Sequence, residues 1–187
     1  LMISVVRISH ERYLCFINDI TARKEIENRL LDSEEKFRGL YLSAQDAIIM
    51  SDDEGRVQLW NRAAQTIFGY TAEQALNQKI SELIIPEKYK KMHEDAYAVF
   101  STTGTGKLIG KTFDIDAISK DGLSIPVEMT ITSVHLKEKW HAMAIIRDIT
   151  DRKRSEEALL ESEARLSITL ETSGIGIWDW DLKKDVW

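Results

Sequence analysis

The sequence predicts an α+β fold, in which helices cover one face of a five-stranded antiparallel sheet. Three observations predict it. Two short β-type runs are followed by a stretch with helical signals, and three further β-type runs come after that stretch. The helical segments begin at cap residues or proline and end at glycines. Strands that are joined by short turns pair in antiparallel fashion, and their shared apolar face needs a cover of helices.

Composition and charge limit the classes of function. The chain has 187 residues, of which 43% are hydrophobic and 30% charged, as in globular proteins. Its net charge of −6 provides no basic surface for phosphates, so no nucleic-acid partner is expected. Cys15 is the only cysteine, which excludes an internal disulfide and fits a reducing, cytoplasmic location. No apolar run approaches the roughly 20 residues of a membrane helix, so no direct membrane contact is expected in this fragment.

An internal repeat predicts the domain organisation. The segment around Asp19-Ile20-Thr21 recurs around Asp148-Ile149-Thr150, at an offset of 148 − 19 = 129 residues. The correspondence continues without a gap for about thirty residues, which indicates tandem units joined by linkers. The predicted parts are the end of a preceding unit (1–22), a linker helix (23–36), one complete domain (37–150), a second linker helix (151–165) and the start of a following unit (166–187).

Both linkers are rich in helix-forming residues, and Thr21 and Thr150 are expected to cap their first turns. The first linker carries a narrow seam with steps of four and three residues, formed by Ile26, Leu30, Ser33, Phe37 and Leu40 or Tyr41. Such a seam suits a partner helix and predicts a homodimer through coiled-coil-like linker helices. The alternative is a helix that packs back on its own domain.

The central domain is expected to begin with a hairpin of strands 47–50 and 57–60 around the turn 52–55. Short helices follow, one from Asn61 to Gly69 and one from Thr71. Pro86 begins a longer helix that the segment 102–106 ends. The last three strands are expected at 108–118, 124–136 and 140–149, with turns at 120–122 and 137–139.

These motifs, in this order and spacing, resemble the PAS (S-box) sensory family. They are Asp52-Asp53-Glu54-Gly55, Asn61-Arg62-Ala63-Ala64, Phe68-Gly69-Tyr70, Lys120-Asp121-Gly122 and Arg147-Asp148-Ile149-Thr150. The resemblance implies a sheet that cups a ligand or cofactor, within a tandem PAS array of a bacterial signalling protein. It also implies a downstream output domain in the same chain, such as a histidine kinase, a cyclic-dinucleotide enzyme or a chemoreceptor.

His93 is the main candidate for cofactor chemistry. It shares one face of the long helix with Tyr89, Ala96, Tyr97 and Phe100, so its imidazole is expected to point toward the sheet. An inward histidine needs a partner, which is either a metal or a backbone carbonyl.

The segment from Ile85 to Tyr97 is similar to that of the rhizobial-type haem-PAS oxygen sensors. This resemblance implies that His93 binds the iron of haem b, the leading cofactor candidate, and that the cofactor is contacted by Tyr97, Leu108, Met129 and Ile131. Met129 is a candidate for the sixth coordination position. Phe113 and Val99 stand where those sensors have arginines, which argues against the same mode of oxygen binding.

Two alternatives to haem remain open. His93 can be a hydrogen-bonded structural residue, and a flavin, less favoured than haem, would contact Trp60, Trp140 or Asn61. Cys15 lies outside the central domain, which argues against cysteinyl-flavin photochemistry. Enzyme motifs are absent from the sequence, so catalysis is expected only elsewhere in the parent protein, for which a sensor histidine kinase and a diguanylate cyclase are the candidates.

Asp148 and Thr150 lie where the last strand meets the following helix. One interpretation is a helix cap alone. In the family, this Asp-Ile-Thr junction is implicated in passing sheet movements to an output helix, so both residues are candidates for signal relay. The predicted function is a sensor and relay module for a small ligand or a cofactor state. The alternative is a PAS module that dimerises and relays without a ligand.

Overall fold

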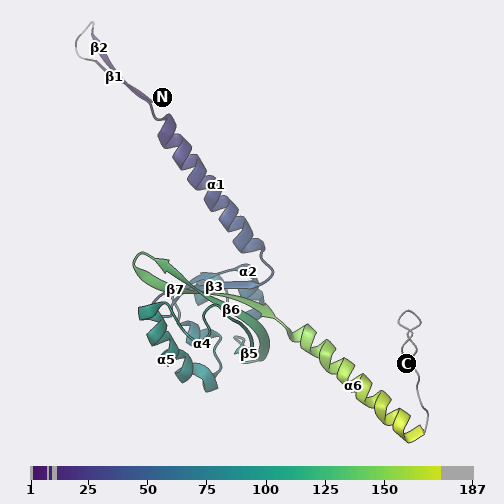
Figure 1. Cartoon of the computed structure of the whole chain (residues 1–187). Coiled ribbons are helices and arrows are strands. Elements are labelled where there is room, and N and C mark those ends of the chain that lie inside the picture. Colours follow the sequence, from purple (N-terminus) through teal and green to yellow (C-terminus); the bar gives the residue numbers. More distant parts are fainter. Residues whose placement is uncertain (1, 8, 10–11, 174–187) are drawn as a thin grey trace, which may run out of the picture.

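The computed structural model describes residues 2–7, 9 and 12–173, and its centre is a single antiparallel sheet (Figure 1). The strand order in this sheet is β4-β3-β7-β6-β5. The strands are β3 (Ala47–Ser51), β4 (Val57–Trp60), β5 (Thr112–Ile118), β6 (Ser124–Leu136) and β7 (Lys139–Asp148). The predicted α+β fold with five antiparallel strands is confirmed.

Four helices between β4 and β5 cover one face of the sheet. They are α2 (Arg62–Phe68), α3 (Ala72–Ala75), α4 (Ile80–Leu83) and α5 (Glu87–Thr103). Two longer helices, α1 (Thr21–Ser43) and α6 (Thr150–Ser173), project away from the sheet in different directions (Figure 1). A two-stranded antiparallel hairpin of β1 (Met2–Arg7) and β2 (Tyr13–Asn18) precedes α1.

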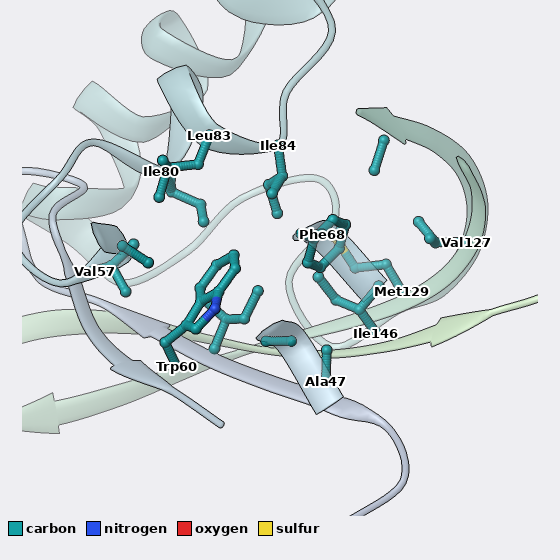
Figure 2. Close-up of a cluster of buried hydrophobic side chains, with 14 residues drawn as sticks. Ala47, Val57, Trp60, Phe68, Ile80, Leu83, Ile84, Val127, Met129 and Ile146 are labelled. Carbon is teal, nitrogen blue, oxygen red and sulfur yellow. The ribbon is translucent and has the colours of Figure 1, made fainter. Parts of the chain in front are cut away.

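The core lies between the sheet and the short helices (Figure 2). Its largest fully buried side chains are Phe68, Ile84 and Ile146, and Trp60 and Met129 pack in the same cluster. Burial of a side chain such as Phe68 stabilises the fold by roughly 1.5–3 kcal/mol. The inner face of the sheet is therefore covered by packed apolar side chains.

The short helices begin and end at residues that cap their terminal backbone groups. Asn61 caps α2 by accepting a hydrogen bond from the backbone N–H of Ala64, and Gly69 ends this helix in the left-handed conformation. Thr71 and Gln74 form a capping box around α3. These caps agree with the boundaries expected from the sequence.

β5 begins four residues later than expected. Gly110 has a φ of 76°, and its N–H donates to the carbonyl of Ile131 at 2.7 Å, so the chain turns before the strand starts. Leu108 lies on this turn and is 43% exposed. The turn between β6 and β7 is also shorter than expected, because Lys137 and Glu138 adopt positive φ and Lys139 already belongs to β7.

Both long helices continue beyond their expected ends at 36 and 165. The expected cap residues Thr21 and Thr150 are instead the first helical residues, and their N–H groups donate to side chains two positions earlier. Asp19 and Asp148 accept these bonds at 2.9 and 2.8 Å. The expected following unit falls partly on α6, and its residues 174–187 lie outside the described residues.

Candidate signal-transfer site

Strand β7 passes into α6 through one buried residue. Ile149 is 3% exposed, and its N–H donates to the carbonyl of Pro126 on β6 at 3.1 Å. Its own carbonyl accepts the N–H of Lys153, while Asp148 accepts the N–H of Thr150. The first turn of α6 is therefore tied to the sheet by the backbone bond from Ile149 to Pro126 and by the carboxylate of Asp148, the last residue of β7.

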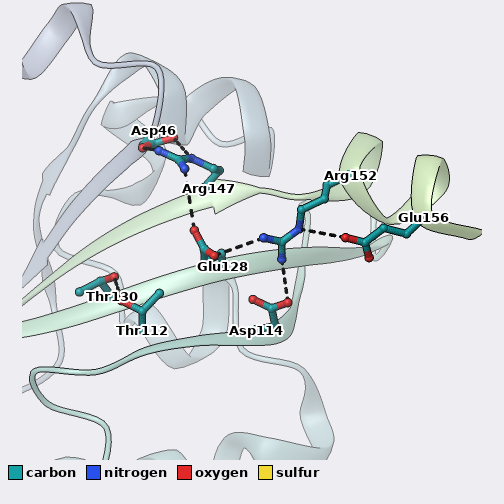
Figure 3. A network of polar contacts seen from close by, with 8 residues as sticks. All are labelled: Asp46, Thr112, Asp114, Glu128, Thr130, Arg147, Arg152 and Glu156. Carbon is teal, nitrogen blue, oxygen red and sulfur yellow. Dashed lines mark hydrogen bonds and ion pairs between the residues drawn. The ribbon is translucent and has the colours of Figure 1, made fainter. Parts of the chain in front are cut away.

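An acidic pair lies on the outer face of the sheet beside this junction. Asp114 on β5 and Glu128 on β6 are directly opposite each other in the strand register. Like charges at such positions destabilise a sheet unless a cation compensates them. Arg152 of α6 lies between them, with Nη2 at 2.8 Å from Asp114 and Nη1 at 3.4 Å from Glu128 (Figure 3). The acidic pair thus favours an orientation of α6 that keeps Arg152 against the sheet.

A second arginine extends this network to the chain before β3. Arg147 on β7 lies opposite Glu128, and its guanidinium is 3.9 Å from that carboxylate. It also forms two hydrogen bonds with Asp46, at 2.8 and 3.1 Å (Figure 3). The Asp46 carboxylate raises the pKa of Arg147. Asp46, Arg147, Glu128, Arg152 and Asp114, here called the junction network, therefore connect the start of β3 with the start of α6.

Asn61 ties the end of α1 to the same region from inside. Its side chain is completely buried, and Oδ1 accepts the N–H groups of Ile48 and Ala64 at 3.0 and 2.9 Å. Its Nδ2 donates to the carbonyls of Tyr41 at 3.3 Å and Asp46 at 3.0 Å. The sequence interpretation considered Asn61 as a cap and as a flavin contact, and it missed this connection. Only the long-range fold brings Tyr41 and Asp46 within reach of the amide.

His93 and Tyr97 lie on α5, along an open depression of about 380 Å³. The depression is bounded by the β3–β4 turn and the start of α4, and it is lined by Asp53, Glu54, Gly55, Lys79, Ile80, Ser81, His93, Glu94, Tyr97, Ala98 and Ser101. Tyr97 donates its hydroxyl proton to the carbonyl of Asp52, so the contact with Ser51 at 2.9 Å must use the Ser51 proton. Burial raises the pKa of Tyr97 to about 12.

His93 is half-buried, and its ring centroid is 5.5 Å from that of Tyr97. Its Nδ1 is buried and has no hydrogen-bond partner among the described residues. Desolvation lowers the pKa of the imidazole, so the neutral form is favoured in the folded domain. The described residues contain no group of three or more His, Cys, Asp or Glu side chains arranged to hold a metal ion.

Comparison with known proteins assigns the central domain. The profile of the PAS fold matches residues 35–149, which is more than half of the chain. The chain belongs to the PAS family. The PAS domain of an HTR-like protein from Haloarcula marismortui superposes with a TM-score of 0.53, at 21% identity over 67% of this chain and 99% of that one. A PAS domain from Colwellia psychrerythraea gives 0.52 at 24% identity, over 63% of this chain and 97% of that one.

Among full-length relatives, an uncharacterized protein of Azorhizobium caulinodans is 31% identical over 69% of this chain. The sensor protein FixL of Bradyrhizobium diazoefficiens is 25% identical over 84% of the chain, and sporulation kinase E of Bacillus subtilis is 28% identical over 82%. The chain spans only 18%, 31% and 20% of the lengths of these three relatives.

The residues expected to contact haem lie in different parts of this PAS domain. Met129 is buried in the apolar core and Ile131 packs against that core. Leu108 is exposed on its turn, and none of these three lines the depression beside His93 and Tyr97. The orphaned Nδ1 of His93 would suit a ligand, but the Tyr97 hydroxyl is already held by Ser51 and Asp52. This arrangement of side chains therefore does not fit a haem.

The side chains considered for flavin are also engaged. Trp60 is in the core and donates from its indole nitrogen to the carbonyl of Tyr70 at 3.1 Å. The ring of Trp140 packs directly over Gly104, which ends α5. No helix in the described part of the chain has the length and apolar character to cross a membrane.

Proposed function

We propose that this PAS domain is a relay module of a larger signalling protein, in which α1 brings a signal in and α6 carries it to an output domain. The observation that carries the proposal is the position of Arg152. It lies on α6, yet its guanidinium neutralises two carboxylates on neighbouring strands. A change in the twist or register of β5 against β6 alters the spacing of those carboxylates and therefore the preferred direction of α6.

The route from α1 to α6 is short. β3 and β7 are neighbours, with Ala47 opposite Ile146, so the chain enters and leaves the sheet at the same end. The backbone carbonyl of Asp46 accepts a hydrogen bond from the Asn61 amide, and its carboxylate accepts one from Arg147. Arg147 and Arg152 in turn both contact Glu128. A displacement at the end of α1 can reach the first turn of α6 without a ligand in the core.

The output domain is proposed to be a histidine kinase in the same polypeptide. Two relatives are a sensor protein and a sporulation kinase, and both are much longer than this chain. Catalysis then belongs to another part of the parent protein, and the central domain relays the signal. The cytoplasmic location and the tandem arrangement with further PAS units remain predictions from the sequence.

Haem is not part of this proposal, because the candidate contacts are divided between the core and the α5 depression. An absorption spectrum of protein expressed with a haem precursor, beside that of a His93→Ala variant, tests whether the domain binds haem. Absence of a Soret band is expected in both proteins. A band that the variant lacks would establish haem binding through His93 and would require a different packing of α5.

The relay is tested in the parent protein by Arg152→Ala, with Arg154→Ala as the matched control. Arg154 lies two residues after Arg152 on α6 and pairs only with Asp151 of the same helix among the described residues. We expect Arg152→Ala to change output activity or its response to signal, while Arg154→Ala leaves both unchanged. Asp148→Ala, which frees the N–H of Thr150, should act in the same direction as Arg152→Ala. Normal regulation in both Arg152→Ala and Asp148→Ala would refute the relay.

A further inference from the structure

The depression beside α5 is bordered by polar groups that the described residues leave without partners. Its volume of about 380 Å³ is within the range of roughly 300–1,000 Å³ that small-molecule sites have. It lies between α5, the start of α4 and the β3–β4 turn, and the core residues Met129 and Ile146 do not line it. The depression is therefore separate from the apolar core at the inner face of the sheet.

Ser81 provides a buried hydroxyl at this depression. The residue is only 6% exposed, and its Oγ forms no hydrogen bond within the described ranges 2–7, 9 and 12–173. A buried polar group without a partner costs free energy, so such groups in native proteins are usually satisfied by a ligand or by water. Because Ser81 lines the depression, a molecule bound there can accept the hydroxyl proton.

His93 provides a second hydrogen-bond donor to the same depression. Its Nδ1 is buried without a partner, whereas Nε2 is not buried and is also unbonded within the described part of the chain. Desolvation lowers the pKa of the imidazole, so the neutral ring carries a single proton. A buried N–H without an acceptor is rarer in proteins than a buried acceptor without a donor. The proton is therefore assigned to Nε2, the accessible nitrogen.

Two side chains of opposite charge border the depression without ion-pair partners. Lys79 directly precedes α4 and Glu94 lies on α5, and neither forms an ion pair with another described residue. The other two carboxylates of the lining, Asp53 and Glu54, already form ion pairs with cations elsewhere in the domain. The charges left for a ligand are therefore one ammonium group and one carboxylate.

Tyr97 gives the depression a wall that is already in place. Its hydroxyl is held by Ser51 and by the carbonyl of Asp52. Its ring lies against Gly55, where an added Cβ would be 3.7 Å from the nearest ring atom. A wall that is fixed before binding reduces the entropy cost of association.

We propose that this depression binds a small zwitterion of the free amino-acid class. Lys79, Ser81 and the Nε2–H of His93 are donors for the carboxylate of the ligand, and hydrogen bonds to an ionised acceptor are the stronger ones. Glu94 is the acceptor for the ammonium group, and its charge disfavours a ligand that is only anionic. The inference goes beyond the proposed relay and does not depend on it, because binding is measured on this chain without an output domain.

L-serine and two analogues, each of which lacks one of its charged groups, test the class of ligand. Ethanolamine lacks the carboxylate, and 3-hydroxypropionate lacks the ammonium group. Binding to the 187-residue chain is followed through the NMR chemical shifts of the imidazole nitrogens of His93. We expect a saturable shift with L-serine and a dissociation constant about tenfold higher or more for each analogue. Equal binding of either analogue, or no saturable shift with L-serine, would overturn the inference.

Substitutions in the lining locate the site. Lys79→Met, Ser81→Ala and Glu94→Gln should each raise the dissociation constant of L-serine about three- to tenfold, because each removes one hydrogen bond or ion pair. Lys91→Met, on the exposed surface of α5 outside the depression, is the control and should leave it unchanged. Ser81→Ala should not lower the thermal stability of the ligand-free chain, since its hydroxyl has no partner there, and this separates a binding role from a structural one. The same affinity in the three lining variants as in the control would refute the site.

Discussion

Replacement of Asn61 by alanine should destabilise the PAS domain more than the small size of the asparagine side chain suggests. The side chain is fully buried and makes four hydrogen bonds, two as acceptor and two as donor. Asn61→Ala leaves the N–H groups of Ile48 and Ala64 and the carbonyls of Tyr41 and Asp46 without these partners. It also removes the N-terminal cap of α2.

The magnitude follows from these four contacts. A hydrogen bond contributes about 1 kcal/mol net, and a buried group left without a partner costs roughly 1–3 kcal/mol. The bond to Tyr41 is long at 3.3 Å, and the two carbonyls lie close enough to the surface for water to replace part of their bonding. We therefore expect a loss of about 3–5 kcal/mol in the free energy of unfolding, which is a large share of the 5–15 kcal/mol or so of a typical domain.

Equilibrium unfolding in urea, followed by circular dichroism and by tryptophan fluorescence, measures this loss. Asn28→Ala on the exposed surface of α1 is the control and should stay within about 0.5 kcal/mol of the parent. Asn61→Asp keeps the two acceptor bonds but places a carboxylate against two carbonyls, so it should also destabilise at neutral pH. A loss below about 1 kcal/mol in Asn61→Ala, at an unchanged m-value, would refute the assigned hydrogen bonds.

Three further predictions concern α5 and its surroundings. Gly104→Ala should destabilise the domain more than Gly122→Ala, because both glycines have positive φ but only at Gly104 would a Cβ collide with the Trp140 ring. Equal losses in thermal unfolding would contradict this packing. Burial raises the pKa of Tyr97 to about 12. The stability that this shift provides is complete below pH 10, the ordinary pKa of tyrosine, and is lost as the pH rises toward 12. Tyr97→Phe should reduce this part of the alkaline loss in urea titrations between about pH 9 and 12. Burial lowers the pKa of His93 below the ordinary histidine value of 6.5. The stability linked to the neutral imidazole is therefore present above pH 6.5 and is lost as the pH falls through the pKa of the folded state. An NMR titration with a His93 midpoint at or above 6.5 would disprove the burial.

The order of elements could be predicted from the sequence because each boundary has a local cause. Asn61 and Gly69 mark the ends of α2 by capping and by a left-handed φ, and neither depends on distant residues. The start of β5 was placed wrongly because the run after Leu108 looks strand-like, whereas Gly110 turns to reach the carbonyl of Ile131. That bond depends on β6, more than twenty residues later, and no local pattern reports it.

Part of the candidate site could likewise be predicted from the sequence, and part could not. Asp148 and Thr150 were found because the repeat marks them, although their role in relay remains a prediction. Arg152 and its carboxylates were missed, since Asp114 and Glu128 meet only through the register of β5 against β6. A signal was present in the alternation along these strands, which places both carboxylates on the outward face. Without the register, however, nothing indicates that they lie opposite each other.

The energetics of the junction network indicate what it can and cannot do. The side chains of Arg152 and Asp114 are each 45% exposed, and exposed ion pairs of this kind are worth roughly 0–1 kcal/mol. The contacts of Arg152 together therefore supply about 1–2 kcal/mol, whereas moving a two-state equilibrium from 1:99 to 99:1 takes about 5.5 kcal/mol. The network cannot drive such a switch alone.

A network that contributes little interaction energy can still determine which orientation α6 adopts when a larger free-energy change comes from another part of the molecule. Helix α1 exposes four large apolar residues, Ile26, Leu30, Phe37 and Leu40, and a change in how they are covered can involve several kcal/mol. Asp46 and Asn61 join the end of α1 to β3, and Arg147, Glu128 and Arg152 join the sheet to α6. In this view α1 supplies the energy and the junction network sets the orientation of α6, so Arg152→Ala should alter regulation while lowering the unfolding free energy by no more than about 1–2 kcal/mol.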